Sequence, residues 1–187
     1  MKPEKQYSVL SELVNNNHYL RHGRILLSEL EPENFCHLKD ISGNAAICVH
    51  FFHFLSLYRK FINSLPRGYM EFCDKDDASF PDYPDKNSHP VFQYTCPVRL
   101  KDDTEKEIAK VIYDLLTLRE HPPESMDLSI HHYTHSADIQ SHLQISTTIS
   151  RELYMLSHVI RHQFILIDQI IRYYNLEVSC FHDSIRS

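Results

Sequence analysis

Glycine is scarce in this chain, with three residues among 187. Barrels and sandwiches need many tight turns, for which glycine is the most permissive residue, so its scarcity favours long helices. The length suits one compact unit, and we expect a single domain over residues 1–187. The 42% of apolar and 24% of charged residues are the balance of an ordinary globular protein.

Several functional classes lack the residues that they need. The formal net charge is −6 and there is no long basic run, which argues against nucleic acid and anionic membranes as partners, because phosphate binding needs clustered Lys and Arg. The five cysteines are never spaced as Cys-x-x-Cys, which excludes zinc-ribbon and thioredoxin motifs. Residues 1–6 are polar and no apolar run is long enough to cross a bilayer, so we expect a cytoplasmic protein.

Apolar periodicity predicts an all-α chain of four main helices. We expect the first helix at about residues 4–30 and the third at about 102–121. The second should run from a cap in residues 42–44 to residue 65, and the fourth from a cap in residues 146–148 to about 175. Residues 66–100 hold five of the nine prolines and are expected to form a long excursion between the second and third helices. Residues 128–132 and 142–145 alternate in polarity and suggest a short hairpin before the fourth helix.

Histidine is common, with 14 residues, and three of them stand out. His50 falls inside the apolar stripe of the second helix, where a buried imidazole needs a partner. His158 and His162 are four residues apart on the fourth helix, so both imidazoles can reach one ion. These three residues are our candidate ligands for a divalent metal ion, and three imidazoles would leave a coordination position open for a substrate.

The residues leave other interpretations open. His50 is also explained by a hydrogen bond to another side chain, which is the commoner fate of a core histidine. His158 and His162 are also explained as part of a solvated stripe with Arg151 and Gln169. The face of the fourth helix opposite the predicted core is itself largely apolar, which suggests a dimer partner. Further histidines stand close together in sequence but look exposed, namely His18 with His22 and the group His131, His132, His135 and His142.

Two blocks resemble signatures of the DinB-like proteins. Residues 41–55 (ISGNAAICVHFFHFL) resemble their second-helix signature, in which a Ser-(Ile/Leu)-Gly turn leads to His-x-x-His in a hydrophobic helix. Residues 146–162 (STTISRELYMLSHVIRH) resemble their last-helix signature, Thr-x-x-x-Arg-Glu-Leu followed by Ser-His-x-x-x-His. The resemblance implies an up-down-down-up four-helix bundle with a long crossover between helices two and three, often a homodimer. It also implies that His50, His158 and His162 are the metal ligands.

Two hypotheses of different kinds remain for the function. One is a metal-dependent transferase or hydrolase that activates water or a small-molecule thiol with zinc, nickel, iron or manganese. Groups that would orient the ligands are His53, Arg151, Glu152 and Gln169. The other is a non-catalytic bundle that acts through dimerisation or partner binding and keeps its histidines for structural reasons. Residues 72–77 (FCDKDD) lack the arginines that related proteins carry after helix two, which favours the second function.

Overall fold

The computed structural model describes residues 9–40, 43, 45–73, 96–123, 125–136 and 139–178. This part of the chain is mostly helical, as the sequence predicts, and it also contains a small three-stranded sheet that goes beyond the predicted hairpin. None of its helices is long and apolar enough to span a membrane. The elements occur in the order α1 (Val9–Glu29), α2 (Pro32–His37), α3 (Ile47–Ser64), η1 (Leu65–Arg67), β1 (Tyr69–Cys73), α5 (Pro97–Glu120), β2 (Asp127–Ser136), β3 (Ile139–Thr148) and α6 (Ile149–Tyr173).

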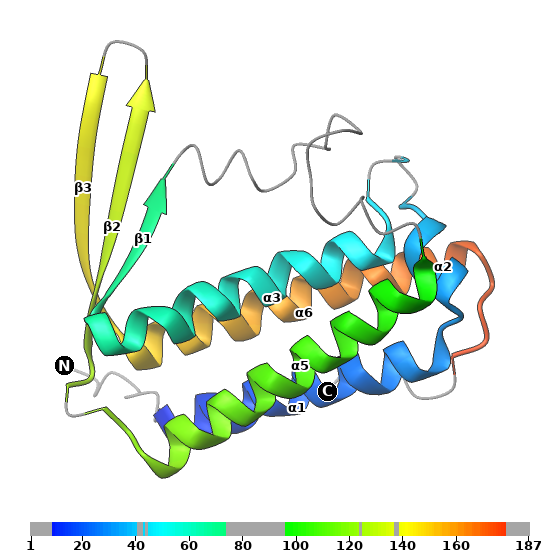
Figure 1. Ribbon diagram of the computed structural model, residues 1–187, viewed down its shortest axis with the longest axis horizontal. Helices are drawn as coiled ribbons and strands as arrows, with labels where there is room; N and C mark the ends of the chain where they lie inside the picture. The colour runs from blue at the N-terminus through cyan, green and yellow to red at the C-terminus, as the bar shows by residue number, and fades with distance from the viewer. Residues whose placement is uncertain are drawn as a thin grey trace, which may run out of the picture.

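Four long helices of this described part lie side by side (Figure 1). α1 packs against α5 and α6, and α3 packs against the same two helices. α1 and α6 run away from the end of the molecule that carries the sheet, whereas α3 and α5 run toward it (Figure 1). α3 and α6 are therefore antiparallel neighbours, so the start of α3 lies beside the second half of α6.

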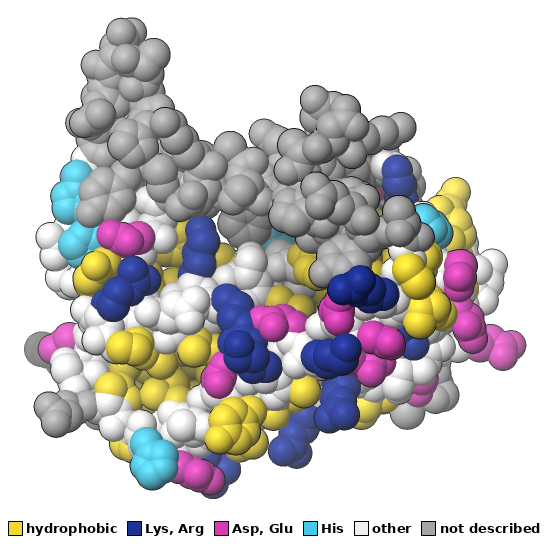
Figure 2. All heavy atoms as spheres, viewed as in Figure 1, with side chains coloured by type: hydrophobic (Ala, Val, Ile, Leu, Met, Phe, Trp, Pro, Cys, Tyr) yellow, Lys and Arg dark blue, Asp and Glu magenta, His cyan; other side chains and the backbone are white. Residues whose placement is uncertain are grey.

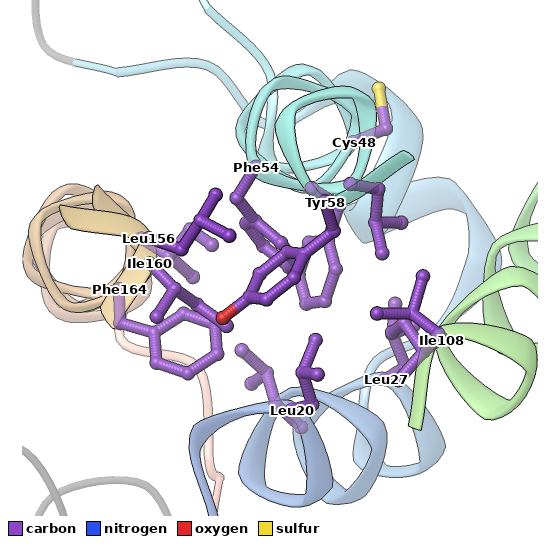
Figure 3. Packing of buried hydrophobic residues seen from close by; sticks show 14 of the residues in the cluster. Leu20, Leu27, Cys48, Phe54, Tyr58, Ile108, Leu156, Ile160 and Phe164 are labelled. Carbon is purple, nitrogen blue, oxygen red and sulfur yellow. The ribbon is translucent and has the colours of Figure 1, made fainter. Parts of the chain in front are cut away.

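The core between the helices is built from the apolar stripes that the sequence predicts. Every member of the α6 stripe is buried, and Phe54 and Tyr58 of α3 point into the same space (Figure 3). Gly23 of α1 permits close packing there, because a Cβ atom at this position would lie 3.1 Å from Cζ of Phe164. The buried α6 residues are Leu153, Leu156, Ile160, Phe164, Ile167 and Ile171.

One buried polar group joins three of the helices. Asn16 of α1 is fully buried, and its Nδ2 donates to the carbonyl oxygens of Glu12, at 2.7 Å, and of Leu153 on α6, at 3.0 Å. The hydroxyl of Tyr58 on α3 donates to Oδ1 of the same side chain. The run Asn15-Asn16-Asn17 suggests a solvated surface, and that interpretation is wrong for Asn16 and Asn17, because the helix turns both amides toward the core.

The sheet is larger than the predicted hairpin. β2 and β3 pair antiparallel over ten residues each, and β1 adds a parallel strand that the sequence did not predict. β1 can begin where it does because Pro66 lies in the terminal 3₁₀ turn and Gly68 adopts φ 74°, which turns the chain out of α3. The sheet therefore lies at the end of α3 farthest from His50.

The helix boundaries differ from the predicted ones by a few residues. α5 begins at Pro97, five residues before the predicted start, since proline is favoured in the first turn of a helix. Thr148 caps α6 as predicted, accepting a 3.2 Å hydrogen bond from the backbone N–H of Arg151. α3 begins after Ala46, whose side chain makes no capping bond. The predicted caps Ser42 and Asn44 lie outside the described residues. Residue 4, the predicted start of the first helix, also lies outside them.

Candidate metal centre

His50 lies in the first turn of α3 and faces the neighbouring helix α6. Helical spacing places it on the stripe of Ile47, Phe51 and Phe54, and its side chain is only 6% exposed. An imidazole in such a place needs hydrogen-bond partners or a ligand for both of its ring nitrogens, because an unpaired buried polar group is costly.

Only one nitrogen of His50 has a partner in the described part of the structure. Nδ1 lies 2.7 Å from Oε1 of Gln163, which α6 carries on its buried side. Since an amide oxygen only accepts, Nδ1 carries the proton and Nε2 keeps its lone pair. Nε2 is buried and has no hydrogen-bond partner among the described residues. A histidine whose one nitrogen is oriented by an oxygen acceptor, while the other offers its lone pair, has the arrangement of a metal ligand.

Two further histidines and one carboxylate lie near His50. Burial lowers the pKa of His50, Gln163 and Asp40 act to raise it, and the nearby charge of His162 lowers it again. Burial also lowers the pKa of His53, and the charges of His50 and His162 add to that effect. His50, His53 and His162 are thus close enough to influence one another, and burial favours the neutral, ligating form of the first two.

The predicted three-histidine site is incomplete in this structure. His158 and His162 are exposed on α6, and the ring of His158 packs against Tyr154 with centroids 4.3 Å apart. Among the residues that the structure describes, no three His, Cys, Asp or Glu side chains are arranged to hold a metal ion. The exposure of both α6 histidines also fits a solvated stripe. The ligand set His50, His158 and His162 therefore stays a prediction.

The other predicted supporting residues lie apart from His50. Glu152 accepts a 2.6 Å hydrogen bond from Oγ1 of Thr147, and Arg151 gives its backbone N–H to the Thr148 cap, so both contribute to the start of α6. Gln169 is exposed on the second half of the helix. Among the predicted orienting groups, His53 lies close enough to His50 for the charge of His50 to lower its pKa.

Sequence reasoning missed Gln163 and Asp40. Gln163 carries a usable signal, because a glutamine on the aliphatic side of α6 needs a buried polar partner. Asp40 lies between α2 and α3, and nothing in its local sequence points toward His50.

Comparisons of this chain with protein-family models, with curated protein sequences and with solved structures gave no match. The resemblance to DinB-like proteins therefore depends on residues 41–55 and 146–162 alone.

Proposed function

We propose that this chain is a DinB-like helical-bundle protein that binds a divalent metal ion between α3 and α6. The observation that carries the proposal is His50, whose Nδ1 is held by Gln163 and whose buried Nε2 lone pair faces no partner among the described residues. His162 and His158 on α6 would complete the site. The arrangement of the four long helices is consistent with an up-down-down-up bundle whose crossover follows α3.

The electrostatic proximity of His53 gives a second form of the same site. His53 is influenced by both His50 and His162, whereas His158 is in contact with Tyr154. The ligands would then be His50, His53 and His162, with His158 outside the site. The two forms differ in one residue, and single variants distinguish them.

The chemistry that such a site would perform is metal-dependent transfer or hydrolysis. A bound divalent ion supplies Lewis acidity, which makes a coordinated water or thiol more acidic. Imidazole ligands suit zinc, nickel, iron and manganese. The residues of this chain would fix the ion: Gln163 orients His50, and the packed aromatic stripe of α3 keeps bulk water away from one side. We propose a small-molecule thiol or water as the second reactant.

The first experiment measures bound metal. The full chain, purified without a histidine tag and stripped with a chelator, is titrated with zinc and with nickel by calorimetry. We expect His162→Ala to lose one equivalent of metal, because the variant lacks one of the proposed ligands. His162 is exposed, so the change should leave the core undisturbed. His18→Ala with His22→Ala is the matched control, because these residues form a pair of the same spacing on α1 with ring centroids 4.2 Å apart. The control should keep the metal that His162→Ala loses.

His53→Ala and His158→Ala then decide which residue completes the site. Loss of metal in one variant and not in the other identifies the ligand. If His162→Ala and the wild type bind the same number of ions with the same affinity, the metal site is wrong. If metal is bound but a screen of low-molecular-weight thiols shows no transfer, the thiol-transfer part of the proposal is wrong.

A second candidate function is partner binding without catalysis, and the exposed apolar side chains of α6 favour it. Met155 is 50% exposed and Tyr173 is 59% exposed, and Ile165 lies on the same helix between them. Sedimentation of the wild type and of Ile165→Glu tests this function. If the wild type is a homodimer that Ile165→Glu dissociates, and if the chain binds no metal between α3 and α6, the non-catalytic function is supported.

A further inference from the structure

Two imidazoles are in contact on one face of the sheet, at the far end of the molecule from His50. Nδ1 of His131 on β2 lies 3.1 Å from Nε2 of His142 on β3, and the ring centroids are 5.1 Å apart. The register explains this contact. His142 is the partner of Tyr133, and residues two apart on a strand share a face, so His131 and His142 are diagonal neighbours on one face.

We propose that His131 and His142 bind a divalent transition-metal ion at a site separate from the one between α3 and α6. Two zinc–imidazole bonds of about 2.0–2.1 Å at a tetrahedral angle place the ligand nitrogens about 3.3 Å apart. The observed separation of 3.1 Å differs from that value by only a few tenths of an ångström. The two rings therefore already have nearly the spacing that a single ion imposes.

Packing holds His131 in this position. The ring of Tyr69 on β1 contacts it with centroids 5.2 Å apart, and the guanidinium of Arg67 lies 5.1 Å above the same tyrosine ring. His131 is half-buried and His142 is exposed, so an ion can approach from solvent. Figure 2 shows histidine side chains at the surface on the side of the molecule that carries the sheet.

Glu71 is placed to add an oxygen ligand. It is the register partner of His131 across the parallel strands β1 and β2, so its side chain projects from the same face. It now pairs with Arg67 at 3.5 Å, and both side chains are nearly half exposed, which makes the ion pair weak. Because no three ligating groups among the described residues are already arranged around an ion, Glu71 has to turn away from Arg67 to join the site.

The ligand types define which ions the site takes. Two imidazoles with an optional carboxylate suit zinc, nickel and copper(II), and the order of affinities of divalent metals places copper(II) first. The ion would join β2 to β3 and, through Glu71, to β1.

The test uses the full chain without a histidine tag, stripped of metal and titrated with zinc and then copper(II) by calorimetry. We expect His131→Gln and His142→Gln each to remove one equivalent, or to weaken it by at least about tenfold, since even the loss of an outer group that orients a ligand weakens metal binding by that factor. The matched control is His132→Gln, because His132 pairs with Leu143 and projects from the opposite face of the same strand. This variant should bind as the wild type does.

A second measurement locates the ion. Substoichiometric copper(II) should broaden the amide resonances of residues 130–132 and 142–144 in the wild type and leave them sharp in His142→Gln. Glu71→Gln should weaken the binding without abolishing it, and an unchanged affinity would exclude Glu71 as a ligand. If His131→Gln and His142→Gln titrate as the wild type does, or if His132→Gln loses the same equivalent, the site is wrong and the two rings share only a hydrogen bond.

Discussion

Tyr58→Phe tests the packing that places α3 against α6. The change removes one hydroxyl and leaves the ring, which is fully buried, with 0% of its side chain exposed. Oδ1 of Asn16 would lose the donor that Tyr58 provides, at a position from which water is excluded. A buried acceptor left without a partner costs about 1–3 kcal/mol. For a chain of 187 residues, that loss corresponds to a decrease in Tm of about 2–12 °C.

The assay is urea unfolding of the metal-free protein, followed by circular dichroism, with thermal unfolding as a second measurement. Tyr113→Phe on α5 is the matched control, because Tyr113 is 68% exposed and its change should lie within about 0.5 kcal/mol of the wild type. If Tyr58→Phe unfolds at the same urea concentration as Tyr113→Phe, with an unchanged slope, then Tyr58 does not hold Asn16. In that case the connection of α1, α3 and α6 through Asn16 would be wrong.

Two further changes test the site and the core separately. Gln163→Leu removes the acceptor of the His50 Nδ1 proton, so we expect zinc affinity to fall by about tenfold to hundredfold in calorimetry. Gln169→Leu is the control, because Gln169 lies on the exposed side of the same helix, and this change should leave zinc affinity unaltered. Gly23→Val adds branched carbons where a Cβ atom alone would lie 3.1 Å from Phe164, so we expect a loss of about 1–3 kcal/mol in urea unfolding. A variant at position 23 that is as stable as the wild type would show that the aromatic cluster can repack at no cost.

The helices were predictable because their buried faces repeat with helical spacing. Ile160, Phe164 and Ile167 recur at intervals of three or four on α6, and the structure buries all three. The same reasoning places His50 on the buried face of α3 from sequence alone. It can do so because the position of a residue on a helix face depends only on its neighbours in sequence.

The features that were missed depend on residues far apart in the chain. Strand β1 forms through parallel pairing with β2, which lies about sixty residues later, and Tyr69–Cys73 has no alternating pattern of its own strong enough to indicate a strand. The burial of Asn16 could not be read from the sequence, because only the fold brings the Tyr58 hydroxyl and the Leu153 carbonyl to it. The pairing of His50 with Gln163 across two helices is of the same kind.

The two proposed metal sites can be tested independently because the fold keeps them apart. His50 lies in the first turn of α3, and the sheet follows the end of that helix, whose 18 residues span about 27 Å. One ion cannot coordinate at both ends of such a helix, so the losses of metal must add. His162→Ala should remove one equivalent, His142→Gln another, and the double variant both. If each single variant abolished the same equivalent, the chain would hold one ion and at least one of the two sites would be wrong.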